Sequence, residues 1–363
     1  MNTKQKALHY AEKACSTMMK KFDAPDLPPK GDFHYHAGVF LSGMMKTYEI
    51  CGGEEYFDYV KKWVDSVVVA PGIVNQYMKG SLDDYMAAIL LFPLYEKTWD
   101  KKYSQTLHML MANIRNWVKN PYGGFYHKEW CPDQVWLDGL YMAGPLQALY
   151  GKTFKEKCFL DEAVRQAVIM YENIQDKETK LLYHAWDASK TAPWCDKETG
   201  LAPEVWGRAL GWYVVAILDI MEHLDENSSE YKKLAEIEKE VLLAVLSYQG
   251  KENKLWYQVV NKADCDGNWP ESSCSCLYVY AAAKAVRMGV IEKEYLEIAL
   301  SGFEAIMKEF VRIDEEDNLI LSGVCIGTGV LDYNGYINRP TSENDLHGMG
   351  AFLLMCSEIA KAN

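Results

Sequence analysis

The sequence lacks the features of nucleic-acid-binding and membrane proteins. Lys and Arg are outnumbered by Asp and Glu, 38 to 51, which leaves a formal net charge of -13. Binding to a phosphate backbone needs clustered basic residues that displace counterions, so nucleic acid is excluded as a partner. An anionic membrane surface is excluded for the same reason. No segment reaches the roughly 18 to 20 uninterrupted apolar residues of a membrane span.

Signals for secretion and for domain division are also missing. The first 22 residues mix apolar side chains with Lys and Glu and lack the continuous apolar stretch of a signal peptide. We therefore expect a cytoplasmic protein. No linker rich in Pro, Gly or Ser interrupts the chain, so we expect residues 1–363 to form one domain. The ten cysteines are scattered, and their spacing predicts buried thiols more than a zinc site.

Common cofactor and nucleophile motifs are absent. The chain has no Gly-x-Gly-x-x-Gly or Walker loop, no Gly-x-Ser-x-Gly elbow, no His-x-x-x-His pair and no calcium-binding loop. Nucleotide binding, serine-esterase chemistry of the elbow type and helical zinc sites are therefore unsupported. We expect a protein that needs no cofactor and no metal.

Helical segments of two kinds alternate along the chain. The amphipathic kind spans residues 4–22, 54–68, 100–118, 153–174, 229–249 and 292–311. The other kind starts with polar or aromatic residues and then becomes apolar all round, as buried helices do; these segments start at His34, Ser81, Gln134, Glu204, Glu271 and Ser342. Such alternation is an internal repeat. It predicts an all-α (α/α)6 barrel, with six inner helices inside six outer ones.

Polar residues should gather at one end of this barrel. The loops that lead into the inner helices are rich in Gly, Trp, Tyr, His and Asp, and their turn residues predict short strands or hairpins. Because each of these loops enters an inner helix at its N-terminus, their side chains converge at the same mouth. This mouth is the predicted functional site.

Asp138 is the most conspicuous acid at this mouth, one turn into a predicted inner helix and close to Trp136. A carboxylate there has a simple alternative role, which is interaction with the helix macrodipole. The repeat, however, puts Asp138, Asp83 and Arg208 in the same register, facing one cavity. Asp84 competes with Asp83, and we select Asp83 because only one of two adjacent helical residues can face inward. Desolvation by aromatic walls would raise the pKa of the acid and suit it to proton delivery.

Aromatic and basic side chains occupy the same helix starts and loops. The aromatic ones are Tyr35, Trp136, Trp206, Trp212 and Trp269, and the basic ones are Lys128, His184, Arg208, Arg339 and His347. Taken singly, such residues are usually core aromatics or ordinary surface charges. Flat rings beside polar groups nevertheless suit a sugar, and basic groups in an acidic protein's cleft can pair with a carboxylate. The combination predicts a uronic-acid ligand.

Through nearly its whole length the sequence resembles the unsaturated rhamnogalacturonyl hydrolases of glycoside hydrolase family 105, which are related to the family 88 unsaturated glucuronyl hydrolases. The segments that carry the resemblance are, in order, FHYHAGVFLSGM, SLDDYMAAILLFPLYEKT, VWLDGLYMAGPL, LLYHAWD, VWGRALGWYVVAILDI, PESSCSCLYVYA and NDLHGMGAFLL. The resemblance implies that Asp138 is the general acid/base and that Asp83 assists it. It implies substrate contacts for Tyr35, Lys128, Trp136, His184, Trp206, Arg208 and Trp212. Arg339 and His347 are further candidates from their charge and position.

The implied substrate is an oligosaccharide whose non-reducing end is a 4,5-unsaturated galacturonic acid linked to rhamnose. Our hypothesis is that protonated Asp138 protonates C4 of this vinyl ether and then, as carboxylate, activates the water that attacks C5. Asp83 would hold Asp138 and the water, while Arg208, Lys128 or His184 would hold the uronate. The alternatives are an unsaturated glucuronyl hydrolase acting on glycosaminoglycan fragments, a sugar epimerase that uses two bases, and a non-catalytic helical scaffold.

Overall fold

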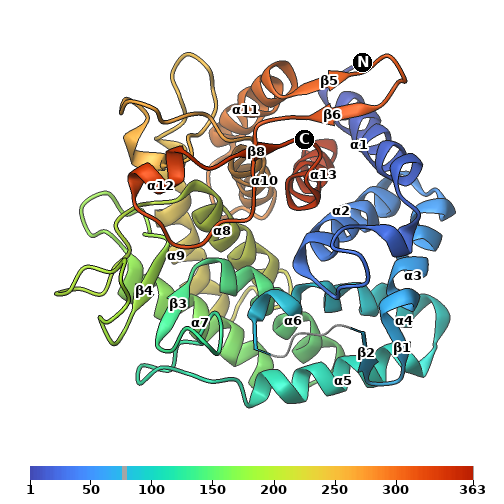
Figure 1. Cartoon of the computed structure of the whole chain (residues 1–363), viewed down its shortest axis with the longest axis horizontal. Coiled ribbons are helices and arrows are strands. Elements are labelled where there is room, and N and C mark those ends of the chain that lie inside the picture. The colour runs from blue at the N-terminus through green and yellow to red at the C-terminus, as the bar shows by residue number, and fades with distance from the viewer. Residues whose placement is uncertain (76–79, 363) are drawn as a thin grey trace.

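The inner ring of the barrel closes on itself in the computed structural model, which describes residues 1–75 and 80–362. Its members are α2 (Tyr35–Cys51), the run of η2 (Leu82–Asp84), η3 (Met86–Leu90) and α4 (Leu91–Thr98), then α6 (Asp138–Phe154), α8 (Gly207–Met221), α10 (Ser272–Arg287) and α13 (Leu346–Lys361). Each member packs on the next, and α13 returns to pack on α2 (Figure 1). The predicted (α/α)6 barrel is confirmed.

The outer helices bury one stripe each. They are α1 (Thr3–Lys21), α3 (Glu54–Val67), α5 (Lys101–Arg115), α7 (Lys157–Ile174), α9 (Ser229–Leu246) and α11 (Leu296–Glu309). In α3 the buried Tyr56, Val60 and Trp63 recur at helical spacing against α2. The inner α8 is different, because every residue except Asp219 is buried. Sequence periodicity thus separates the two layers correctly.

The second inner segment departs from the predicted continuous helix. Between Ser81 and Leu91 the chain makes two 3-10 turns, and the α-helix starts only at Leu91. Pro93 fits this late start, because a proline deeper inside a helix lacks its amide donor and clashes with the carbonyl four residues earlier, although α6 accommodates Pro145 in its interior. A helix that begins at Leu91 places Pro93 in the first turn, where no donor is required.

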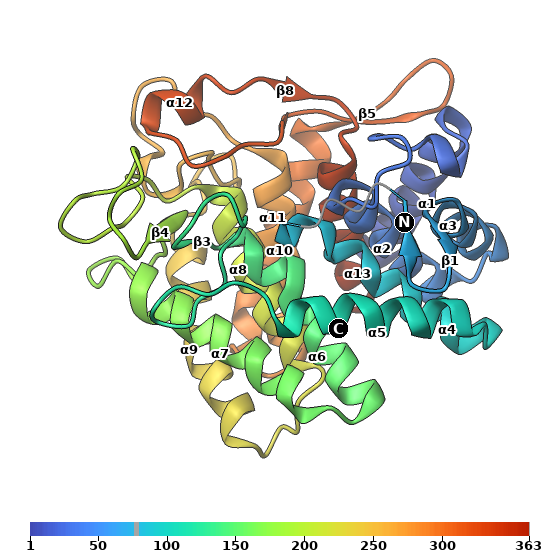
Figure 2. The ribbon, with the colours of Figure 1, turned by 60° about the horizontal axis from the view of Figure 1, so that its bottom comes forward.

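Short strands join the loops at one mouth of the barrel. The strands are β1 (Val68–Ala70), β2 (Ile73–Val74), β3 (Gln134–Trp136), β4 (Ala185–Asp187), β5 (Val311–Ile313), β6 (Leu319–Leu321), β7 (Val324–Cys325) and β8 (Thr341–Ser342). They pair as consecutive antiparallel couples, with Val135 opposite Trp186 in β3 and β4. The short elements η1 (Ala24–Asp26), η4 (Val260–Lys262), η5 (Lys293–Tyr295) and α12 (Tyr333–Ile337) complete the fold. In Figure 2, β3, β4, β8 and α12 lie along one side while α6, α7 and α9 extend away from them.

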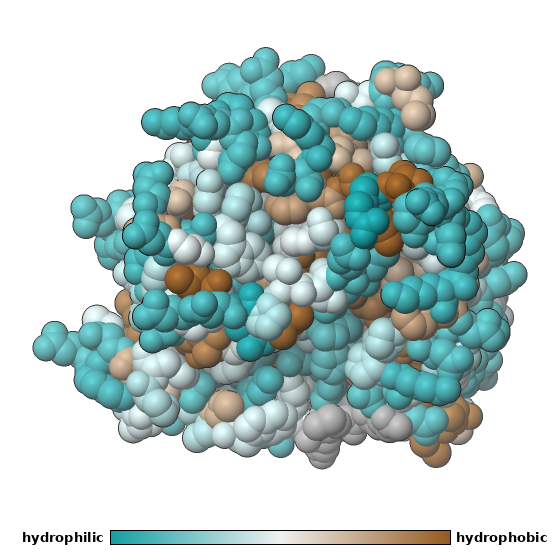
Figure 3. All heavy atoms as spheres, turned by 45° about the horizontal axis from the view of Figure 1, so that its top comes forward, coloured by the Kyte–Doolittle hydropathy of each residue, from teal (hydrophilic) through white to brown (hydrophobic). Residues whose placement is uncertain are grey.

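The surface is mainly hydrophilic on the face shown in Figure 3, where hydrophobic atoms form small separate groups. Across the described residues, no helix combines the length and the hydropathy that crossing a bilayer requires.

Candidate active site

A pocket of about 330 Å³ opens at the mouth where the inner helices begin. Its wall consists of His34, Tyr35, His36, Asp83, His127, Lys128, Trp136, Asp138, Met142, Gly327, Thr328 and Gly329. Because α2 begins at Tyr35 and α6 at Asp138, two helix N-termini face the pocket. The positive ends of these helix dipoles favour an anionic group there.

Asp138 is the first residue of α6, not one turn inside it as predicted. The preceding residues form β3, and the main-chain N–H of Leu137 donates to His184 O at 3.0 Å. Gly139 follows, and a Cβ at this position would approach Leu82 Cδ1 to 3.0 Å and His127 Nδ1 to 3.2 Å. A glycine therefore allows the acid's helix to pack closely against the 3-10 turn that carries Asp83.

A chain of hydrogen bonds orients the Asp138 carboxylate. His184 Nε2 lies 3.0 Å from Asp138 Oδ2, and His184 Nδ1 lies 2.6 Å from the Tyr336 hydroxyl. The Leu331 N–H donates to that hydroxyl at 3.1 Å. Because a carboxylate can only accept, the Nε2–H of His184 donates to Asp138. The acid is thus held from behind by a buried imidazole.

The pKa of Asp138 is lower than that of an ordinary aspartate, which corrects our prediction of a raised value. Burial alone would raise the pKa, as predicted. The hydrogen bond and the charge interaction with His184 outweigh burial, and His127 lowers the pKa further. In the free enzyme at neutral pH, Asp138 is therefore a carboxylate.

Asp83 lines the same pocket and faces two basic groups. His127 Nε2 is 3.4 Å and Lys128 Nζ is 3.6 Å from its carboxylate oxygens. Asp84 is buried outside the pocket wall, and burial together with the neighbouring Asp83 raises its pKa to about 8. Of the two adjacent acids, Asp83 is the one beside Asp138's cavity.

Lys128 and Trp136 form one side of the pocket. The Lys128 ammonium lies 5.4 Å from the Trp136 ring centre and its side chain remains 26% exposed. The His127 ring stacks on Trp136 with centroids 4.6 Å apart and an angle of 18° between the planes. This side therefore offers a flat face and a cation that a ligand can reach.

Arg208 does not line the pocket, contrary to the predicted register. Its guanidinium donates to Cys325 O at 2.7 Å and to Ile326 O at 2.8 Å, and it is 2% exposed. Glu271 Oε1, fully buried, lies 3.8 Å away. Arg208 supports the chain segment that continues into the pocket residues Gly327 and Thr328.

The remaining predicted contacts also lie behind the pocket wall. Trp206 packs on His184, with ring centroids 4.7 Å apart, and Trp212 stacks on Tyr141 at 4.4 Å, deep in the barrel. Arg339 donates to Thr328 Oγ1 at 3.0 Å, so it anchors the pocket loop. The other two anchor other parts of the mouth: His347 lies 3.0 Å from Cys325 O, and Trp269 donates to Ile337 O. Tyr35, Asp83, Lys128, Trp136 and Asp138 are the predicted residues that meet in the pocket.

Sequence reasoning missed several residues of the site. His34 and His36 flank Tyr35, and His127 precedes Lys128. Their position next to predicted site residues could have identified them from the sequence. The contact of Tyr336 with His184 could not be predicted, because the two residues are far apart in the sequence. Among the described residues, His36, Asp345 and His347 form the group whose ligand atoms lie close enough to hold a metal, within 4.8 Å of one another.

Comparison with known proteins agrees with this geometry. A profile of Glycosyl Hydrolase Family 88 matches residues 10–363. The unsaturated rhamnogalacturonyl hydrolase YesR of Bacillus subtilis is 25% identical over 336 residues, covering 89% of this chain and 88% of YesR. A family 105 glycoside hydrolase structure from C. acetobutylicum is 32% identical with a TM-score of 0.93, covering 97% of this chain and 99% of that chain. An unsaturated glucuronyl hydrolase specific for heparin shares the fold at 17% identity and a TM-score of 0.76, covering 99% of this chain and 97% of that one. This chain therefore belongs to the glycoside hydrolases of families 88 and 105, and it is an unsaturated glycosyl hydrolase.

Proposed function

We propose that this enzyme removes the 4,5-unsaturated galacturonyl residue from rhamnogalacturonan-derived disaccharides and short oligosaccharides and thereby releases rhamnose. The observation that carries this proposal is the meeting of Asp83, Asp138 and Lys128 in one pocket at helix N-termini. Two carboxylates supply proton transfer and water orientation, and one accessible cation suits a single carboxylate on the sugar.

The reaction is hydration of a vinyl ether. Asp138, once protonated, donates its proton to C4, which places positive charge on C5 and the ring oxygen. The Asp138 carboxylate then takes a proton from water as the water oxygen bonds to C5. The resulting C5 hemiketal opens by breaking its C5–O5 bond, which gives a ketone at C5 and a hemiacetal at C1. That hemiacetal collapses to an aldehyde, so the C1–O1 bond breaks and rhamnose leaves with the proton on its oxygen. Because the anomeric carbon is not attacked, the distance between the two carboxylates does not report retention or inversion.

Substrate binding favours the protonated form of Asp138. A uronate carboxylate beside Asp138 disfavours a second negative charge, and exclusion of water strengthens that effect. The bound substrate therefore raises the pKa of Asp138 and converts it to the acid form. Asp83, beside His127 and Lys128, holds the water in this scheme.

Lys128 is the residue that we assign to the uronate. Arg208 is buried against main-chain carbonyls and His184 is committed to Asp138, so neither has a free face toward the pocket. Lys128 is the only Lys or Arg among the described residues of the pocket wall. A single ammonium suits a single carboxylate better than a multiply sulfated sugar. The similarity to YesR, an unsaturated rhamnogalacturonyl hydrolase, extends over most of both chains. It also supports the rhamnogalacturonyl substrate over the glucuronyl alternative.

The decisive assay compares unsaturated rhamnogalacturonan and chondroitin disaccharides. We expect the purified enzyme to remove the absorbance of the C4=C5 double bond and to release rhamnose from the first substrate, with kcat/KM at least about tenfold higher than for the second. A pocket selective for one sugar by a few contacts achieves a discrimination of about this size. Faster turnover of the chondroitin disaccharide would overturn the substrate assignment.

Lys128→Met serves as the matched variant in this assay. Loss of the uronate partner should raise KM about tenfold or more and leave kcat less affected. The exposed Lys293→Met, which lies outside the pocket, is the control and should match the wild type. An unchanged KM in Lys128→Met would remove Lys128 from substrate recognition.

The pH profile should report the interaction between His184 and Asp138. The acid form of Asp138 is the active one, so the rate falls as pH rises through its pKa. Because His184 lowers that pKa, replacing His184 with Leu should move the descending limb of kcat/KM to higher pH, even if the absolute rate drops. In the wild type, the limb of kcat should lie at higher pH than that of kcat/KM. A limb that moves to lower pH in His184→Leu would contradict this assignment.

A further inference from the structure

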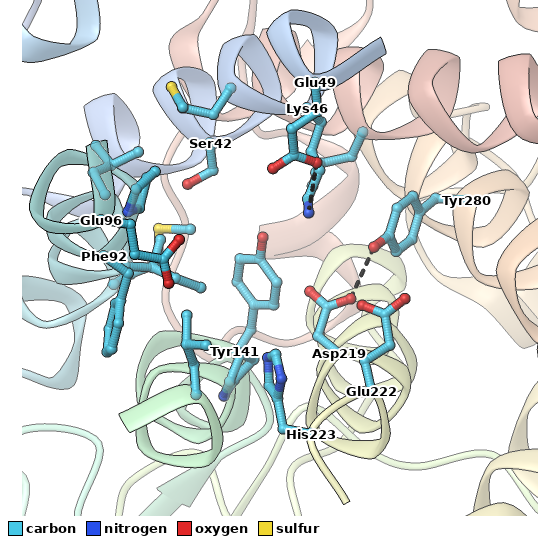
Figure 4. A pocket seen from close by; sticks show the side chains of 18 residues that line it. Ser42, Lys46, Glu49, Phe92, Glu96, Tyr141, Asp219, Glu222, His223 and Tyr280 are labelled. Atoms are coloured by element: carbon cyan, nitrogen blue, oxygen red, sulfur yellow. Dashed lines mark hydrogen bonds and ion pairs between the residues drawn. The ribbon is translucent and has the colours of Figure 1, made fainter. Parts of the chain in front are cut away.

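A second cavity, of about 260 Å³, lies where inner helices α2, α4 and α8 end. Figure 4 shows side chains from several inner helices pointing into it, among them Ser42, Tyr141, Asp219, His223 and Tyr280. None of its lining residues lines the candidate active site. Met142 lies between them, because it borders the active-site pocket and a small void that also touches Tyr141. We call this second space the far-end cavity.

Acidic side chains occupy the helix ends at this cavity. Glu49 lies in the last turn of α2, Glu96 in the last turn of α4, and Asp219 in the last turn of α8, with Glu222 as the α8 C-cap. Neither α2 nor α8 has a basic residue in its last turn. Carboxylates at helix C-termini are unfavourable because the negative end of the macrodipole lies there. The carboxylates and the negative helix ends together create a negative potential in the cavity, which attracts cations.

The neighbouring basic residues neutralise only part of this charge. Lys284 pairs with Asp219 and Glu222, Arg287 with Glu222 and Glu358, and Lys46 with Glu49. Lys361 also pairs with Glu358. Of the four carboxylates in the cavity wall, Glu96 is the one without an ion pair among the described residues. Burial lowers the pKa of His223 to about 4, so at neutral pH this ring adds no positive charge.

Two hydroxyl groups inside the cavity lack hydrogen-bond partners among the described residues. Tyr141 is 5% exposed, its ring stacks on Trp212, and Figure 4 shows its hydroxyl pointing into the cavity. Ser42 Oγ is buried without a partner. Asp219 receives Lys284 and the Tyr280 hydroxyl on Oδ1, which leaves Oδ2 available. Buried polar groups of this kind are usually satisfied, and a ligand with N–H donors would satisfy them.

The rest of the wall is apolar and mostly aliphatic, with the aromatic ring of Phe92 as the exception. The aliphatic part comprises Met45, Met86, Ile89, Leu90, Pro93, Pro145, Leu149 and Leu354. A sugar has polar groups around its whole rim, and apolar side chains leave such groups without hydrogen bonds, so this part of the wall suits it poorly. An aliphatic chain loses apolar surface to water here, with a gain of roughly 0.8 kcal/mol per buried methylene.

We propose that the far-end cavity is a binding site for a small organic cation that carries an ammonium group on an aliphatic body. The ammonium donates to Asp219 Oδ2, Tyr141 and Ser42, and Glu96 contributes long-range attraction. The aliphatic body packs against the methionine and leucine side chains. This site is independent of the glycosidase reaction, and its occupant does not compete with the uronide.

The test uses hexylammonium as probe, with hexanol and hexanoate as its neutral and anionic counterparts, and measures binding by titration calorimetry. We expect hexylammonium to bind at least about tenfold more tightly than hexanol, because a charge-assisted hydrogen bond is worth about one to two powers of ten. Hexanoate should bind weakest. Equal affinity for the three compounds, or no binding of hexylammonium, would overturn the proposal.

Variants locate the binding. Tyr141→Phe removes only the unpartnered hydroxyl and should weaken hexylammonium severalfold, and Asp219→Asn should weaken it at least about tenfold. Because Asp219 also pairs with the buried Lys284, the exposed Glu96→Gln is a second variant that keeps the fold and should weaken binding about twofold. Glu297→Gln, an exposed acid on α11, is the control and should bind like the wild type. If Asp138→Asn abolishes binding while Tyr141→Phe and Asp219→Asn do not, the cation occupies the active-site pocket and the proposal is wrong.

Discussion

Asp138→Asn should lower kcat for the unsaturated galacturonyl disaccharide by about a thousandfold, within the range that a general acid/base contributes. The amide keeps the size of the side chain and can still meet His184, but it cannot deliver a proton to C4. Substrate affinity should change by less than about tenfold, because Lys128 and Trp136 remain in place. The measurement is the loss of double-bond absorbance, together with calorimetric binding of the uncleaved sugar.

Asp133→Asn is the matched control for this variant. Asp133 belongs to the same loop before α6 but lies outside the pocket wall, where it accepts a hydrogen bond from Tyr126. Its turnover should stay within about twofold of the wild type, as for most substitutions away from the reacting atoms. Wild-type turnover in Asp138→Asn, with the sugar bound, would exclude Asp138 as the proton donor.

Arg208→Met should destabilise the protein by about 3 kcal/mol or more, the usual cost of removing one partner from a buried charged network. Glu271 would lose its cation, and the carbonyls of Cys325 and Ile326 would lose their donors. The expected result is a lower midpoint of urea unfolding with an unchanged slope.

The control for Arg208 is Arg312→Met. Arg312 pairs with Glu343 on the surface, where both side chains are more than half exposed, so its loss should cost no more than about 1 kcal/mol. The two roles considered for Arg208 predict different outcomes. A residue that binds the uronate directly would raise KM on substitution and leave the urea midpoint unchanged, and that result would contradict the structural role inferred from its buried contacts.

The sequence predicted the barrel because periodicity reports burial directly. An inner helix such as α8 is apolar on all sides, while an outer helix such as α3 has one apolar stripe. This difference can be seen in the sequence without knowing which helices are in contact. The break in the second inner segment could not be predicted from Pro93 alone, because α6 runs through Pro145 without a break. The exact residue at which each helix begins could not be predicted from periodicity. The start of α6 at Asp138 depends on β3 pairing with β4, which lies about fifty residues later in the chain.

The direction of the Asp138 pKa shift could not be predicted for a related reason. The burial of Asp138 could be predicted from the sequence, because Trp136 and Leu137 precede it. Burial alone raises the pKa of a carboxyl group. The opposing influence comes from His184, which Tyr336 holds from a third segment of the chain. Arg208 was misplaced because a guanidinium on an inner helix can point toward the cavity or toward main-chain carbonyls, and periodicity does not distinguish the two.

The inner helices all start at one mouth of the barrel, which gives the protein a polarity along its axis. An anionic sugar is drawn toward the N-terminal ends, and the same field opposes its passage toward the acidic far end. We therefore expect substrate and anionic product to enter and leave through the same mouth of the barrel. In the proposed mechanism, the keto acid product leaves through this mouth before the next unsaturated sugar binds beside Asp138.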